Sequence, residues 1–187
     1  MIQSVVLFAH IVGVLGLFVG LALEWVSLEA VRQATSREEA TRWVRVDAAL
    51  PRTAGIAVAL ILVSGFYLGA RIGVLGETWM RASYVTMILM AIVGGPVLRE
   101  RMRALRQAAT DRGDRALGRL RAAASDATLQ LSVRVRIVFG VAVVYLMVRK
   151  PEAAEAVLVT ILGAVVALVL ALARRQARAA VAREAVS

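Results

Sequence analysis

Long apolar runs separated by arginine-rich stretches limit what this chain can fold into more than any other feature of its sequence. Hydrophobic residues make up 60% of its 187 residues. An α-helix needs about 20 apolar residues to cross the hydrocarbon of a bilayer. The sequence therefore predicts an all-α, polytopic membrane bundle, a single unit over residues 1–187, with five transmembrane helices at about 2–23, 54–71, 79–98, 129–148 and 154–173.

Basic residues are distributed unevenly between the two sides of this predicted bundle. Nineteen arginines lie in or beside residues 24–53, residues 99–128 and the tail after residue 173, whereas the other side holds only Arg71, Arg81, Arg149 and Lys150. By the positive-inside rule, the N-terminus is expected outside and the C-terminus in the cytoplasm. We expect a multi-pass membrane protein that contacts the bilayer and, on its cytoplasmic side, anionic headgroups.

The net charge of +10 does not indicate a nucleic-acid partner. Single-stranded nucleic acid is bound by basic grooves with interleaved aromatic side chains, and the arginine-rich segments contain almost none. The chain also has no cysteine. This excludes disulfides, thiolate metal sites, iron–sulfur clusters and covalently attached c-type haem.

The arginine-rich segments carry helix and turn signals of their own. Ser36-Arg37-Glu38-Glu39 matches a capping box and predicts an amphipathic helix over 37–49 that ends at Pro51, with this proline opening the second span. Asp111-Arg112-Gly113-Asp114 predicts a turn. Residues 99–128 are thus expected to form a charged cytoplasmic helical hairpin, either a solvated stalk or a docking surface for a partner.

His10 is the only histidine and lies inside the first apolar run. An ionisable side chain within a membrane span is costly to bury, so it usually faces the bundle interior and marks a functional site. Helical spacing places it on one face with Gln3, Val6, Gly13, Leu17, Gly20 and Glu24. Two interpretations remain open: a packing seam in which His10 bonds to a neighbouring helix, or a slot for a ligand.

A basic residue near the fourth span is placed to neutralise Glu24. Arg134 and Arg136 are two positions apart, or about 200° around a helix, so at most one of them faces the bundle interior. We expect that one to pair with Glu24.

The third span adds a candidate partner for His10. If the N-terminus is outside, His10 lies about 12 Å below the outer surface, and Met87 reaches a similar depth. Histidine and methionine are a known axial pair for haem iron, although methionine at helical spacing also fills cores. Arg71 and Arg81 lie nearest the outer surface, where they would either meet haem propionates or extend to the headgroups.

Several local patterns resemble those of a known family. They are His10 followed by Ile-Val-Gly and by Gly20, the stretch from Pro51-Arg-Thr-Ala-Gly to Leu62-Val-Ser-Gly-Phe-Tyr-Leu68, and Trp79. Over roughly residues 1–100, the chain resembles a bacterial family of predicted integral membrane proteins of unknown function, which implies a location in a bacterial inner membrane. That family is distantly similar to copper-resistance D proteins and J-type protoporphyrinogen oxidases, which are bundles associated with b-type haem. The lysine that J-type oxidases show after this tryptophan is absent here, where Ser83 and Tyr84 stand instead.

Two functions remain open from the sequence. The first is a redox protein that binds haem b, with His10 as the axial metal ligand. The residues that would form this cofactor site are His10, Met87, Gly13, Gly20, Arg71 and Arg81. A bis-histidine haem would need two protomers, and therefore a homo-oligomer. The second is a non-enzymatic scaffold or assembly factor without a cofactor, and no complete catalytic constellation indicates an enzyme.

Overall fold

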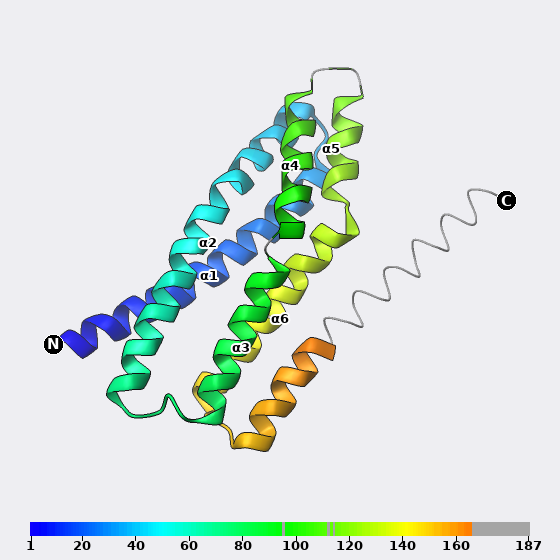
Figure 1. Cartoon of the computed structure of the whole chain (residues 1–187). Coiled ribbons are helices and arrows are strands. Elements are labelled where there is room, and N and C mark those ends of the chain that lie inside the picture. The colour runs from blue at the N-terminus through cyan, green and yellow to red at the C-terminus, as the bar shows by residue number, and fades with distance from the viewer. Residues whose placement is uncertain (95, 112, 114, 166–187) are drawn as a thin grey trace.

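The computed structural model describes residues 1–94, 96–111, 113 and 115–165; for residues 49, 51, 52 and 96–101 it describes the backbone alone. Every described element is an α-helix, which confirms the all-α prediction for this part of the chain. The helices are α1 (Ile2–Gln33), α2 (Arg37–Arg71), α3 (Thr78–Val93), α4 (Pro96–Thr110), α5 (Ala116–Ala124) and α6 (Ala127–Arg149), followed by a helix over Ala153–Val165 (Figure 1).

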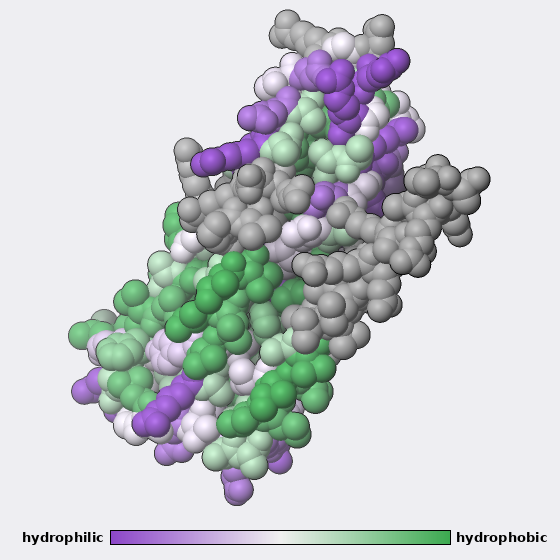
Figure 2. All heavy atoms as spheres, turned by 45° about the vertical axis from the view of Figure 1, so that its right-hand side comes forward, coloured by the Kyte–Doolittle hydropathy of each residue, from purple (hydrophilic) through white to green (hydrophobic). Residues whose placement is uncertain are grey.

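Three stretches are long and apolar enough to cross a membrane. They are Ile2–Gln33, Arg37–Arg71 and Ala116–Arg149, the last of which contains α5 and α6. Thr78–Val93 and Ala153–Val165 are apolar but shorter, and part of the predicted span 154–173 lies outside the described residues. Apolar side chains form a broad band over one part of the surface, while polar side chains gather beyond it (Figure 2). Five spans, and the orientation of the termini, stay predictions.

α2 begins as the capping signal predicts but runs further than expected. The Ser36 hydroxyl accepts a hydrogen bond from the Glu39 amide at 3.2 Å, and the Glu39 carboxylate accepts one from the Thr35 amide at 2.9 Å. The predicted end of this helix at Pro51 was wrong, because α2 continues to Arg71. Proline lacks the amide that would bond to the carbonyl four residues earlier. Packing along α1 on both sides of Pro51 offsets this loss.

The helical chain is interrupted at both ends of α4. α3 ends at Gly94, whose amide donates to the Met90 carbonyl, and α4 begins at Pro96. α4 and α5 are joined across residues 111–115, where the Asp111 carboxylate accepts a hydrogen bond from the Gly113 amide at 3.1 Å. Residues 96–124 therefore form two helices that fold back on each other.

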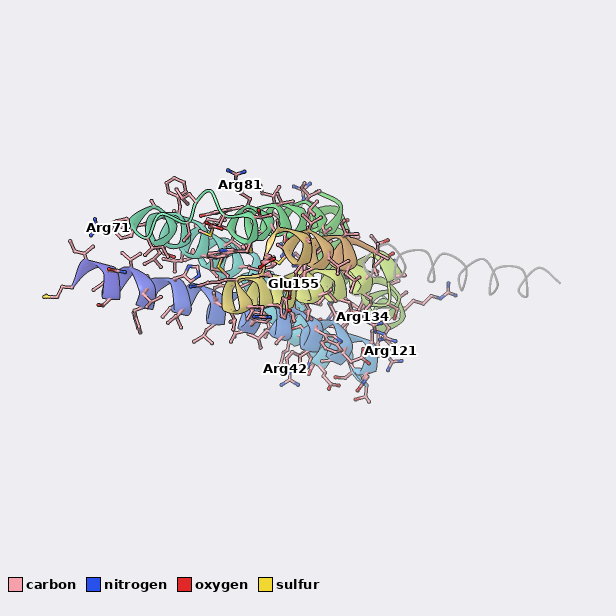
Figure 3. All side chains as sticks on the ribbon, turned by 90° about the horizontal axis from the view of Figure 1, so that it is seen from below. Arg42, Arg71, Arg81, Arg121, Arg134 and Glu155 are labelled. Atoms are coloured by element: carbon pink, nitrogen blue, oxygen red, sulfur yellow. The ribbon has the colours of Figure 1, made fainter. Side chains whose placement is uncertain are left out.

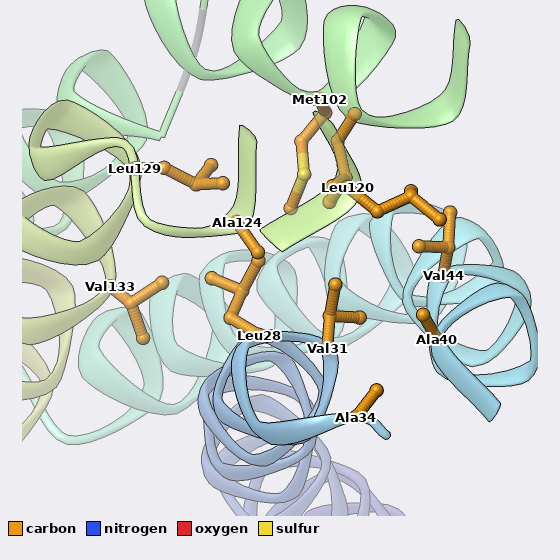
Figure 4. Packing of buried hydrophobic residues seen from close by; sticks show 11 residues of the cluster. Leu28, Val31, Ala34, Ala40, Val44, Met102, Leu120, Ala124, Leu129 and Val133 are labelled. Atoms are coloured by element: carbon orange, nitrogen blue, oxygen red, sulfur yellow. The ribbon is translucent and has the colours of Figure 1, made fainter. Parts of the chain in front are cut away.

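α4 and α5 pack against the adjoining ends of α1, α2 and α6 to form what we call the head (Figure 1). The head has its own apolar core (Figure 4). This core consists of Leu28, Val31, Ala34, Ala40, Val44, Met102, Leu105, Leu120, Ala124, Leu129 and Val133. Arg121 Nε donates to the Ala34 carbonyl at 3.0 Å, and Arg37 Nε donates to the Asp111 carbonyl at 2.9 Å. The hairpin is therefore packed onto the other helices rather than extended from them.

A second apolar core lies in the part of the bundle that carries the apolar surface, which we call the membrane part. It consists of Leu17, Leu21, Ala57, Ile61, Met87, Met90, Val135, Phe139 and Val143. α1 packs along α2, and α3 packs along α6. The helix Ala153–Val165 rests on α3 and α6, since Ala156 is fully buried beside Trp79 and Leu146.

Candidate functional site

His10 is half-buried between α1 and α2 and bonds to Ser64 of α2. Its Nδ1 lies 3.0 Å from Ser64 Oγ, and the Ser64 hydroxyl donates to the Leu60 carbonyl. A hydroxyl has one proton to donate, so Ser64 accepts its bond from the ring. This arrangement places the proton of a neutral His10 ring on Nδ1 and leaves Nε2 as an acceptor.

Two residues that sequence reasoning did not assign to the site lie beside His10. A Cβ added at Gly65 would be 3.2 Å from His10 Cε1 and 3.9 Å from the hydroxyl of Tyr84. The absence of a side chain at Gly65 is thus what allows the ring to approach α2. The Tyr84 hydroxyl is buried without a hydrogen-bond partner among the described residues. Its signal in the sequence was a polar aromatic residue within the third apolar run.

Gly13 and Gly20 lie on the same face of α1 but in different surroundings. A Cβ at Gly13 would be 3.0 Å from Ile61 Cγ1 and 3.1 Å from the Ala57 carbonyl oxygen, so α2 fills this side of α1. No atom lies within 4 Å of a Cβ built at Gly20, although this residue is buried. Gly13 therefore belongs to a packing seam, and Gly20 borders open space.

The other residues predicted for a haem site do not converge on His10. Met87 is 4% exposed and packs in the apolar core of the membrane part. Arg71 and Arg81 are exposed, and their side chains extend away from the bundle (Figure 3). Ile61, which fills the space beside Gly13, packs in the same core as Met87.

A buried ion pair lies where the membrane part meets the head. Arg136 donates to the Glu24 carboxylate at 2.5 Å, and both side chains are about one-tenth exposed. Arg136 Nε also donates to the Ser132 carbonyl, and its Cδ would lie 3.0 Å from a Cβ at Gly94. The prediction that one of the two arginines at the start of the fourth span pairs with Glu24 is confirmed.

Asp47 is the second carboxylate at this junction, and sequence reasoning missed its importance. It is 2% exposed, and neither of its carboxylate oxygens has a hydrogen-bond partner among the described residues. Burial, followed by the nearby charge of Glu24, raises the pKa of Asp47 to about 7, against the opposing effect of Arg106 and Arg136. The signal was a carboxylate on the apolar face of an amphipathic helix, at helical spacing from Trp43 and Val44.

The head carries a groove of about 630 Å³ between α2 and α4. Its charged lining is mostly basic: Arg37, Glu38, Arg42, Arg45 and Arg106. Arg42 and Arg45 are exposed, whereas Arg37 is held by the carbonyls of Ala109 and Asp111 at the end of α4. Among the described residues, no group of three or more His, Cys, Asp or Glu side chains could hold a metal ion.

Comparison with known proteins places the chain in a family. The family model of the predicted integral membrane proteins DUF2269 matches residues 4–151. The chain belongs to this family. The match spans α1 to α6, so it includes the His10–Ser64 pair, the Glu24–Arg136 pair and Asp47. No curated protein and no solved structure was found to match the chain. The DUF2269 chain is thus an integral membrane protein.

Proposed function

We propose that this DUF2269 protein is a membrane-anchored scaffold whose head docks an acidic segment of another protein. The observation that carries this proposal is the groove of about 630 Å³ in the head, with four arginines and one glutamate in its lining. Opposite charges across an interface steer encounter and favour the correct partner. The packed core of the head holds α2 and α4 in fixed relation, so the arginines are presented by rigid helices.

The position of the groove favours a soluble acidic partner over lipid headgroups. Arg42 lies about 18 Å, and Arg37 about 25 Å, along α2 from the start of the apolar run at Ala54, at 1.5 Å per residue. The headgroup layer extends only about 5–8 Å beyond the hydrocarbon. Arginines at the far end of the groove therefore lie beyond the headgroups. A nucleic acid is a weaker fit because Trp43, the aromatic residue nearest these arginines in the sequence, packs against the core of the head.

The binding experiment uses the purified full chain in nanodiscs of zwitterionic lipid and a fluorescent glutamate-rich helical peptide. We expect Arg42→Glu/Arg45→Glu to weaken binding at least tenfold and added salt to weaken it for the wild type. Arg71→Glu/Arg81→Glu is the matched control, since it reverses two exposed arginines at the other end of the bundle. Equal binding by both double variants, or no binding by the wild type, overturns the proposal.

The scaffold also requires the head to face the cytoplasm. The chain has no cysteine, so single-cysteine variants report topology without background. Gly118 on the exposed side of α5 and Gly76 in the α2–α3 loop are both open to a new side chain, since their nearest atoms would be 4 Å or more away. We expect a membrane-impermeant thiol reagent added to intact cells to label Gly76→Cys and not Gly118→Cys. The reverse pattern would contradict the proposal.

The bond between His10 and Ser64 favours a second candidate, a haem b bound between two copies of the chain. A histidine that ligates a metal usually donates its other ring proton to a fixed acceptor, and His10 is arranged this way with Nε2 remaining. His10 is half-buried and lies among exposed apolar side chains of α1 such as Leu7 and Ile11, so a second copy has access to this side of the helix.

A visible absorption spectrum of protein purified from cells supplied with haem separates this candidate from the scaffold. A Soret band that disappears in His10→Ala, while Met87→Ala keeps it, supports haem held by two histidines. A colourless protein that takes up no added haem excludes haem binding. The peptide-binding experiment is unaffected by either result.

A further inference from the structure

A cavity of about 500 Å³ lies where the membrane part meets the head. This volume is within the range of about 300–1,000 Å³ that is usual for small-molecule sites. Residues from α1, α2, α3, α4 and α6 line it: Leu17, Gly20, Leu21, Glu24, Asp47, Leu50, Ala54, Gly55, Val58, Met90, Ala91, Gly94, Met102, Arg103, Arg106 and Arg136. The break between α3 and α4 borders this space, so no continuous helix fills that side.

The lining changes from apolar to charged along the helix axes. Leu17 and Leu21 precede Glu24 on α1, and Val58 lies 11 residues beyond Asp47 on α2, or about 16 Å. The apolar end therefore points into the membrane part, and the charged end adjoins the head. A molecule with an apolar chain and a polar head, oriented as lipids are oriented in a leaflet, matches this gradient.

The charged end contains polar atoms that the described residues leave unsatisfied. Both oxygens of Asp47 and the Nε of Arg106 are buried without a hydrogen-bond partner there. Burial of a polar group without a partner is unfavourable, and in native proteins such groups are rare and need an explanation. Glu24 already has its partner in Arg136. Asp47 and Arg106 therefore have atoms left to meet a ligand, and Arg103, an exposed arginine, lines the same cavity.

The balance of charge at this end indicates the sign of the head group. Arg103, Arg106 and Arg136 face two carboxylates, of which Glu24 is neutralised by Arg136. The remaining two arginines outnumber Asp47. A cationic head would be repelled by this excess, whereas an anionic head would bond to the arginines and accept a hydrogen bond from the protonated carboxyl of Asp47.

We propose that this cavity binds an amphiphile with an acyl chain and an anionic head, with the chain along Leu17, Val58 and Met90 and the head between Asp47, Arg103 and Arg106. A free fatty acid and an anionic phospholipid share this chemistry. The site is separate from the docking groove apart from Arg106, which lines both, and it is independent of the scaffold function.

Gly20 offers a way to fill the cavity without disturbing the fold. A Cβ there meets nothing within 4 Å, so Gly20→Leu places its side chain in the open space. Gly118→Leu is the matched control, because Gly118 is also helical and also has nothing within 4 Å, but it lies exposed on α5. Both changes replace a helical glycine by a better helix former. Gly55→Leu fills the cavity from α2, and it is the alternative cavity-filling variant if Gly20→Leu does not fold.

The test measures binding of a long-chain fatty acid with a fluorophore at its chain end to the full chain in neutral nanodiscs. We expect Gly20→Leu to weaken binding at least tenfold and Gly118→Leu to leave it unchanged. Arg103→Gln should weaken binding of the acid about tenfold and binding of its methyl ester much less. Competition by unlabelled fatty acid or by an anionic phospholipid then identifies the source of the ligand, and either result supports the site.

Three results would overturn the proposal. The first is equal binding by the Gly20→Leu and Gly118→Leu proteins, with Gly55→Leu also unchanged. The second is equal affinity for the acid and its ester, which removes the anionic head. The third is no saturable binding by the folded wild type. None of these three results affects the outcome of the acidic peptide assay. Failure of this site and failure of the scaffold are therefore distinguishable.

Discussion

Two polar residues on one face of α1 have opposite surroundings. His10 lies where α2 packs closely against α1: Ser64 accepts the hydrogen bond of its Nδ1, and the space beside Gly13 is filled. Glu24 lies about 21 Å further along the same face, beside open space at Gly20 and a buried carboxylate without a partner. The spacing of polar and small residues is similar at both ends. The neighbouring helices therefore decide whether each end of this face is closely packed or borders a cavity.

The number of neighbouring helices explains the difference. Near His10, the residues in closest contact come from α2, and side chains of one helix interlock with those of the other. Near Glu24, five helices approach and one of them has just ended at Gly94. Helices of different direction and length cannot all pack closely at one point. The remaining volume is enclosed by side chains that are apolar toward the membrane part and charged toward the head.

The largest difference between the two ends should come from loss of an ion-pair partner. Arg136→Ala leaves the Glu24 carboxylate buried and unpaired, and removal of one partner of a buried pair destabilises a protein by about 3–5 kcal/mol. Thermal unfolding in detergent measures this effect. The double variant Glu24→Gln/Arg136→Met should recover most of the loss. An Arg136→Ala protein as stable as the wild type would show that Glu24 finds another partner.

The sequence predicted the elements of the fold better than their boundaries. Length and hydropathy located the apolar helices, and the Ser36 cap and the turn after Asp111 follow from side-chain hydrogen bonds that span a few residues. The prediction failed at Pro51, because a local helix-breaking preference was outweighed by packing against α1 on both sides of the proline. Tertiary contacts of that kind are not encoded within a short window.

The candidate sites were predictable to different degrees for the same reason. The Glu24–Arg136 pair followed from helix geometry, since only one of two arginines 200° apart can face inward. The His10 face was located, but whether it held a ligand or another helix depended on Ile61 of α2. The cavity escaped prediction because it arises where α3 ends beside α4. Asp47 acquires its importance only from that junction.

Leucine substitutions at Gly13 and Gly20 should affect stability differently, because Gly13 lies in the packing seam and Gly20 borders the cavity. Gly13→Leu forces a side chain against Ile61 and the Ala57 carbonyl, and such overpacking costs about 1–3 kcal/mol or more. Gly20→Leu should leave the unfolding temperature equal to or above that of the wild type, because its side chain enters open space. The comparison is made by thermal unfolding of both proteins in the same detergent. Similar destabilisation of the two would mean that Gly20 is packed as closely as Gly13.

The dependence of stability on pH should report the burial of Asp47. The pKa of its carboxyl is about 7 in the folded protein, against an ordinary value of 3.8 for an aspartate in water, so the folded state binds more protons between these values. The contribution of Asp47 to stability is therefore largest below pH 4, falls as the pH rises to 7, and is constant above that. The groups that face Asp47 are Glu24 on α1, Arg103 and Arg106 on α4, and Arg136 on α6.

Asp47→Asn isolates this contribution, because asparagine resembles the protonated acid in shape and carries no charge. At pH 8 we expect the variant to be more stable than the wild type by up to about 4 kcal/mol, with the gap closing toward pH 4. Glu152→Gln, at an exposed carboxylate, is the control and should leave the pH profile unchanged. A wild-type profile that matches that of Asp47→Asn would contradict the burial of a titrating carboxyl.

The smallest effect should come from the hydrogen bond at the His10 end. Ser64→Ala removes the acceptor of the ring proton, and hydrogen bonds between membrane helices contribute about 0.6 kcal/mol on average. The apolar contacts around Gly13 remain, so α1 and α2 should stay associated and the unfolding temperature should shift only slightly. A loss of stability in Ser64→Ala comparable to that in Arg136→Ala would mean that the seam depends on its polar pair rather than on close packing. A small shift, measured beside the large one at Glu24, would show that the same face of α1 is stabilised by close packing at one end and by charge pairing at the other.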